Sequence, residues 1–208
     1  QRAVIWMRQQ KFKEATDDCG TALQLDPTNV VALETRATVQ MQQGKLDAAL
    51  TDYREAIRLD PNSWRALLGL ALVWERKRSR DNAIRDLNQV IRILPNAYAY
   101  GMRASLWQKN QDFDKAISDY TEAIRLDPKY SLAFYSRGSA WMTKGNIKKA
   151  IQDYTATIRL RPDFVKAYLS RSNCYADSDN FEAAIRDLNE ALRRTSDDSV
   201  EKIIAIYD

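Results

Sequence analysis

Residues 116–128 read AISDYTEAIRLDP, and this stretch decides the fold. Ala116, Tyr120, Ala123 and Ile124 recur at i, i+4, i+7 and i+8, which is the apolar stripe of an amphipathic helix. Pro128 cannot continue a helix, and it favours an extended backbone at the preceding residue. The stretch therefore predicts a helix that packs on one face and stops at the proline. Residues 49–61 and 150–162 repeat it almost unchanged.

The prolines show that this helix belongs to a repeated unit. The chain has five, spaced 34, 34, 33 and 34 residues apart: Pro27, Pro61, Pro95, Pro128 and Pro162. A second stripe of helical spacing precedes the first in each unit, and the turn between the two holds Gly44 or Gly145 in two of them. Alternating β-branched runs and hairpin turn signals are absent from the sequence. A fixed period of this length predicts an all-α solenoid of helical hairpins.

Four core positions recur in register through six units. A small residue on the first helix occurs at Ala3, Ala37, Ala71, Ala104, Gly138 and Ser172. A large residue three positions later occurs at Trp6, Gln40, Trp74, Trp107, Trp141 and Tyr175. A small residue opens the second helix at Ala15, Ala49, Ala83, Ala116, Ala150 and Ala184. A bulkier residue follows at Cys19, Tyr53, Leu87, Tyr120, Tyr154 and Leu188.

With these positions the sequence resembles the tetratricopeptide repeat family, whose unit is a helix–turn–helix of 34 residues. The resemblance implies a right-handed α-solenoid of about six stacked hairpins. We expect a repeat array over residues 1–196, with units at about 1–29, 30–63, 64–96, 97–130, 131–164 and 165–196. The first unit begins only two residues before its small core position, so we expect it to be truncated. Residues 197–208 carry a stripe of Val200, Ile203, Ile204 and Tyr207, which favours a C-terminal capping helix over the first helix of a further unit.

Composition argues against an enzyme. The chain has no histidine, which removes the commonest general base and the commonest metal ligand. Gly-rich phosphate loops and nucleophile elbows are also absent from the sequence, so we expect no cofactor and no metal. Cys19 and Cys174 lie more than four units apart and are expected to be free thiols, which weakly favours a reducing, cytoplasmic compartment. No stretch of the sequence is apolar enough for membrane insertion.

Charged residues recur with the repeat as well. An Asp precedes each bulky position of the second helix: Asp18, Asp52, Asp86, Asp119, Asp153 and Asp187. An Arg precedes the small position of the first helix in five units: Arg2, Arg36, Arg103, Arg137 and Arg171. The two sets could form a repeated ion-binding site, but ion pairs that hold the helices in register are the favoured interpretation. The third unit has Leu70 in place of Arg, so Asp86 must find another partner.

The family resemblance implies that the first helices line a concave groove. The groove positions in the middle of the chain are apolar, aromatic or Met, a composition typical of protein-binding surfaces. The candidate peptide-binding residues are Leu68, Leu72, Tyr98, Met102, Leu132, Tyr135 and Met142. We expect Gly69 and Gly101 to keep the floor of the groove low. The alternative is that some of the candidates pack against neighbouring first helices.

The sequence therefore favours a non-catalytic interaction scaffold that binds an extended peptide or a partner helix. Neither the chaperone carboxylate clamp nor the asparagine ladder known in this family is present at its positions. Two alternatives remain: a single-stranded nucleic-acid-binding repeat and a self-assembly module that forms a homo-oligomer. Glu34, Glu75 and Asp177 occupy groove positions and argue against a surface that follows phosphates, so no specific nucleic acid is expected.

Overall fold

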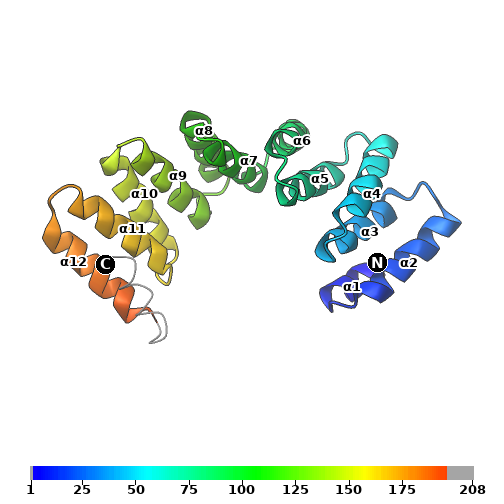
Figure 1. Ribbon diagram of the computed structural model, residues 1–208, viewed down its shortest axis with the longest axis horizontal. Coiled ribbons are helices and arrows are strands. Elements are labelled where there is room, and N and C mark those ends of the chain that lie inside the picture. The colour runs from blue at the N-terminus through cyan, green and yellow to red at the C-terminus, as the bar shows by residue number, and fades with distance from the viewer. Residues whose placement is uncertain (1, 196–208) are drawn as a thin grey trace. The chain divides into compact units, whose positions relative to one another are not determined.

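The computed structural model describes residues 2–195, and the expected capping helix at 197–208 lies outside this range. The described residues form twelve helices and no strand, and consecutive helices pair into hairpins (Figure 1). The first helices of the hairpins are α1 (Arg2–Arg8), α3 (Val30–Gln42), α5 (Trp64–Arg76), α7 (Ala97–Lys109), α9 (Ser131–Thr143) and α11 (Val165–Ala176). The second helices are α2 (Phe12–Leu25), α4 (Leu46–Leu59), α6 (Arg80–Ile93), α8 (Phe113–Leu126), α10 (Ile147–Leu160) and α12 (Phe181–Arg193).

Proline sets the end of five second helices. The residue before each proline is the C-cap, with φ between −143° and −133°. This extended backbone is the conformation that a following proline favours. The next first helix can then begin with a side-chain cap: Asn29 accepts a hydrogen bond from the Ala32 N–H, and Ser63 accepts one from the Ala66 N–H.

The turn inside each hairpin places one residue in the left-handed region. Gly44 and Gly145 have φ of 76° and 75°, as their residue type predicts. The same position in the other four hairpins has φ between 57° and 64°, although it holds Gln10, Arg78, Gln111 and Asp179. The turn geometry is therefore conserved along the repeat even where glycine is not.

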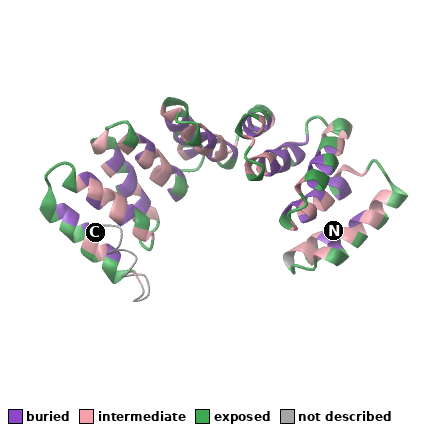
Figure 2. Cartoon of the chain, in the orientation of Figure 1, coloured by how far each residue is buried: buried purple, intermediate pink, exposed green. Residues whose placement is uncertain are grey.

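The described residues form two compact units, unit 1 up to Ala99 and unit 2 from Tyr100, with the boundary in the first turn of α7. In each unit the buried residues line the faces along which helices pack (Figure 2). The recurring small positions are closed to solvent: Ala37, Ala49 and Ala83 in unit 1, and Ala104 and Ala116 in unit 2, are 0% exposed. The helices can approach closely because these side chains take up little space.

Candidate peptide-binding surface

The Arg–Asp pairs hold the two helices of a hairpin together. In four hairpins both oxygens of the Asp accept hydrogen bonds from Arg at 2.7–2.8 Å, as in the pair of Arg103 with Asp119. Arg2 and Asp18 form the same two-bond pair. The aspartates of the four pairs are buried, so their carboxylates are occupied and face the hairpin interior. These residues are structural, as the sequence favoured.

Two buried side-chain oxygen atoms have no hydrogen-bond partner among the described residues. The Oδ2 atom of Asp86, in the hairpin with Leu70, has no hydrogen-bond partner, and the other partner of this carboxylate is the side chain of Trp74. Gln40 occupies an aromatic position, and its buried Oε1 also has no partner. Both atoms lie where the sequence departs from the family pattern.

The unit 1 candidates are Leu68 and Leu72 on α5 and Tyr98 on α7. Leu68 and Leu72 are half-buried, and Leu72 packs against the core cluster around Leu33, Tyr53 and Leu70. Tyr98 is 49% exposed. Tyr98 is thus the most accessible of the three, and Leu72 contributes to packing as well.

The unit 2 candidates are Met102, Leu132, Tyr135 and Met142. Leu132 is 46% exposed, whereas the other three are half-buried. The ring of Tyr135 lies 5.6 Å from that of Tyr154 and 5.0 Å from that of Phe164, measured between centroids. Met142 packs against the core cluster of Tyr154 and Cys174. Tyr135 and Met142 therefore contribute to the packing between helices, whereas Leu132 is the most accessible residue of this set.

The hydroxyl groups of two buried tyrosines on second helices form hydrogen bonds with side chains on the first helices of their hairpins. Tyr53 shares a 2.9 Å hydrogen bond with Thr38, and Tyr120 donates one of 3.2 Å to Gln108. Burial raises the pKa of both phenols, so they remain protonated donors. Sequence reasoning placed these tyrosines in the core but gave no indication of where their hydroxyl groups lie.

Our expectation that glycines keep the groove floor low was wrong. Gly69 is buried, and a Cβ there would lie 2.3 Å from Cζ of Tyr53. Gly101 is buried too, and a Cβ there would lie 2.9 Å from the ring of Tyr130. Each glycine makes room for a tyrosine ring, and neither forms a surface.

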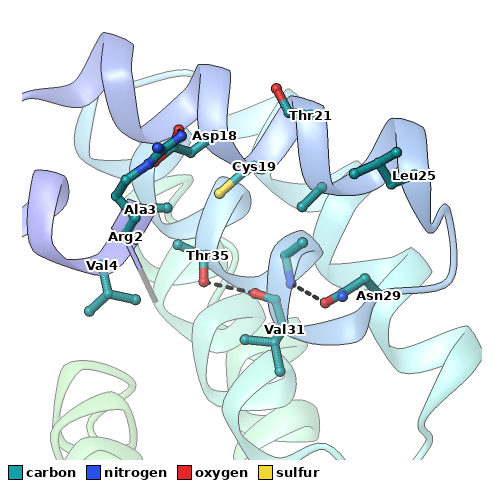
Figure 3. Close-up of a pocket in the computed structure, with 12 residues that line it drawn as sticks. Arg2, Ala3, Val4, Asp18, Cys19, Thr21, Leu25, Asn29, Val31 and Thr35 are labelled. Atoms are coloured by element: carbon teal, nitrogen blue, oxygen red, sulfur yellow. Dashed lines mark hydrogen bonds and ion pairs between the residues drawn. The ribbon is translucent and has the colours of Figure 1, made fainter.

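A hollow that the sequence did not indicate lies among α1, α2 and α3 (Figure 3). Its volume is about 520 Å³, and Ala3, Cys19, Leu25 and Val31 form much of its apolar wall. Leu25 and Val31 are exposed, whereas Cys19 is buried, and burial raises the pKa of its thiol. The Cys19 thiol is therefore protonated and unreactive at neutral pH.

Comparison with known proteins identifies the repeat. A family model described as tetratricopeptide repeat matches residues 35–98, 102–163 and 142–199. The chain belongs to the tetratricopeptide repeat family. Its helical hairpins form the α-solenoid of this family, and the resemblance read from the sequence is confirmed.

Several solved structures share the fold of this tetratricopeptide repeat chain. A crystal structure of the MamA protein is 25% identical, with a TM-score of 0.75 over 83% of this chain and 94% of that one. YrrB, a TPR protein with an unusual peptide-binding site, is 20% identical, with a TM-score of 0.74 over 86% and 93%. PilW, a type IV pilus biogenesis factor, is 18% identical, with a TM-score of 0.82 over 98% and 96%. A search of curated proteins found no significant match.

The described residues offer neither a metal site nor a membrane-spanning helix. Within residues 2–195, no group of three or more Cys, Asp or Glu side chains is arranged to hold a metal ion. None of the helices in the described part of the chain is both long and apolar enough to cross a bilayer.

Proposed function

We propose that this chain is a non-catalytic interaction scaffold whose first helices bind an extended peptide or a partner helix. Family membership supports a role in protein binding. The sequence supplies no histidine for acid–base chemistry. The buried aspartates of the paired hairpins, which could otherwise act as acids or bases, are occupied by arginines.

The observation that carries the proposal is the exposure of Leu132 on α9. Its neighbour Ala133 is 1% exposed and belongs to the core, whereas Leu132 is 46% exposed. A large apolar side chain on a helix face that the family uses for binding can be covered by a ligand. Met102 and Met142 are half-buried in the same unit, and flexible Met side chains adapt to different ligands.

Unit 1 offers a comparable residue in Tyr98, with Leu68 and Leu72 on α5. A tyrosine that is 49% exposed provides apolar area together with a hydroxyl group, and such residues are frequent anchors at interfaces. YrrB, which shares the fold, carries a peptide-binding site by its description, and this supports the proposed class of ligand.

The proposal can be tested by selecting peptides from a display library against the whole chain and measuring their affinity by calorimetry. For a ligand bound by unit 2, Leu132→Ala should weaken binding by about 2 kcal/mol, which is the loss expected of an anchor residue. The matched control is Leu126→Ala, which removes an exposed leucine from a second helix of the same unit. Equal affinities of wild type and Leu132→Ala for every selected unit 2 ligand would contradict this site.

A further inference from the structure

Five of the six hairpins pair the recurring Asp with an Arg, and in four of them this Asp is buried; the third hairpin has a buried Asp without the Arg. Its Asp86 on α6 is 8% exposed, nearly as buried as Asp52 and Asp119 at 5% and 6%. The position that supplies Arg elsewhere holds Leu70, which is itself buried in the core of unit 1. The third hairpin therefore keeps the carboxylate but has lost the guanidinium that neutralises it.

The remaining surroundings of Asp86 do not replace that guanidinium. Oδ2 is buried without a hydrogen-bond partner, and the neutral side chain that favours the carboxylate is Trp74 on α5. The charged groups of unit 1 that act on it are Arg85 on α6 and Arg54 on α4, both exposed to solvent. Arg54 lies over the Trp74 ring, with Cζ 5.5 Å from the centroid, and forms no ion pair with Asp86 among the described contacts.

A buried carboxylate without a counter-charge favours its neutral form. Desolvation raises the pKa of Asp86 from 3.8 to about 6, and the nearby arginines and Trp74 only partly oppose this. In an unfolded chain the same group would titrate near its ordinary pKa. Folding therefore takes up a proton at this site between about pH 4 and pH 6, and the stability of the folded state falls as the pH rises through 6.

The paired Asp18 of the first hairpin responds to pH in the opposite direction. Arg2 lowers the pKa of Asp18, so this pair stabilises the fold above the ordinary pKa of Asp and loses its effect as the solution becomes more acidic. Above about pH 5 the Arg2–Asp18 pair remains ionised and contributes no slope. Asp86 thus differs from Asp18 in that its pKa is raised to about 6, which places its titration between pH 5 and pH 7.5.

We propose that the α5–α6 hairpin is a proton-dependent element of unit 1, in which protonation of Asp86 removes a buried unpaired charge and tightens the packing of the two helices. The proton comes from solvent and binds a carboxylate oxygen. Loss of the proton leaves the charge between the helices and favours local opening of this hairpin before the others. The inference stands whether or not the proposed peptide-binding function is correct.

The direct test follows the Trp74 indole N–H by NMR in the intact chain. Its resonance, assigned by comparison with Trp74→Phe, should shift with a midpoint near pH 6 because the indole interacts with the titrating carboxylate. The shift should be absent in Asp86→Asn. A Trp74 resonance that is the same from pH 5 to pH 7.5 would overturn the proposal without any need for a stability measurement.

The second test measures urea unfolding at about pH 5 and pH 7.5. The wild-type folding equilibrium constant should be on the order of tenfold larger at pH 5, the ratio that follows from pKa values of about 6 folded and 3.8 unfolded. Asp86→Asn and Leu70→Arg should each abolish this difference, the first by removing the charge and the second by pairing it. The readout is the pH dependence, so a change in overall stability caused by Leu70→Arg does not affect the conclusion.

A matched variant removes the arginine partner of a buried Asp in another hairpin. Arg137→Leu removes the partner of Asp153 in unit 2 and should add a second pH dependence of the same sign. If wild type and Asp86→Asn share one pH dependence, or if Arg137→Leu adds none, the missing arginine is not the cause and the proposal fails.

Discussion

Gly69 shows how far a single residue can be constrained by a neighbouring hairpin. It lies on α5 against the ring of Tyr53, a side chain that is 2% exposed and cannot move aside. We expect Gly69→Ala to lower the free energy of unfolding by about 1–3 kcal/mol, the usual cost of overpacking a core. Chemical denaturation monitored by circular dichroism would measure this change.

Gly20 provides the control for that prediction. It also lies within a helix of unit 1, but a Cβ there would have no atom within 4 Å. Gly20→Ala should raise stability by up to about 1 kcal/mol, since alanine is the better helix former. If both substitutions changed stability alike, contact with Tyr53 would not be what requires glycine at position 69.

The residues of the core were largely predictable from the sequence, because the repeat samples each position six times. One period places Ala49, Ala83 and Ala116 in equivalent sites, and all three are fully buried. The role of Gly69 was not predictable, since it depends on where a tyrosine ring from another helix lies. The left-handed turn at Arg78 or Gln111 likewise follows from the register of the repeat and not from the residue type.

The Arg–Asp bonds join the two helices of a hairpin, and a substitution at Asp119 measures their contribution to the free energy of unfolding. Asp119→Ala removes the two carboxylate oxygens that accept hydrogen bonds from Arg103 and takes away the opposite charge beside a largely buried guanidinium. We expect a loss of about 3 kcal/mol in the free energy of unfolding. Binding of a selected peptide should be retained once the variant is folded, because Asp119 faces the hairpin interior.

The control is Asp114→Ala, which breaks the ion pair of an exposed Asp with Lys144 in the same unit. Exposed pairs contribute less than about 1 kcal/mol, so this variant should resemble wild type. A selective loss of peptide binding in Asp119→Ala, without a loss of stability, would mean that this residue belongs to a binding site.

The last described helix, α12, exposes an apolar face that is half-buried on the equivalent helix α10. Phe181 and Ile185 of α12 are 60% and 57% exposed, whereas Ile147 and Ile151 hold the same positions on α10, which packs against α11, and are half-buried. The sequence predicts that residues 197–208, which lie outside the described range, cover this face as a capping helix. Deleting them should therefore increase binding of the dye ANS and promote self-association measured by light scattering.

Substitution of Ile203 and Ile204 by serine offers a milder form of the same test. The stripe that would face α12 loses its apolar side chains while the length of the chain is kept. ANS binding should rise nearly as much as in the deletion. If neither variant differs from wild type in dye binding or association, the apolar face of α12 has some other cover and the expected cap is wrong.

The candidate binding surface was less predictable than the fold, for a reason that applies to all repeat proteins. The period identifies which positions lie on a first helix, but not which of them a neighbouring helix covers. Tyr135 and Leu132 both satisfy the pattern, yet Tyr135 packs against Phe164 while Leu132 stays exposed. The sequence selects the face, and only the packing shows which side chains on it remain available to a ligand.

For the molecule as a whole, the main alternative to peptide binding is a single-stranded nucleic acid. The chain has 32 Lys and Arg against 28 Asp and Glu, a formal net charge of +4, and this would give only weak, sequence-independent attraction to phosphates. We expect fluorescence anisotropy with a labelled oligonucleotide to show an affinity that falls linearly with salt on a log–log plot and vanishes near physiological ionic strength. A selected peptide held by apolar contacts with residues such as Leu132 should lose far less affinity over the same range, because apolar burial releases no counterions. An oligonucleotide complex that survives physiological salt, together with peptides that do not, would reverse this assignment and make the first helices a nucleic-acid-binding surface.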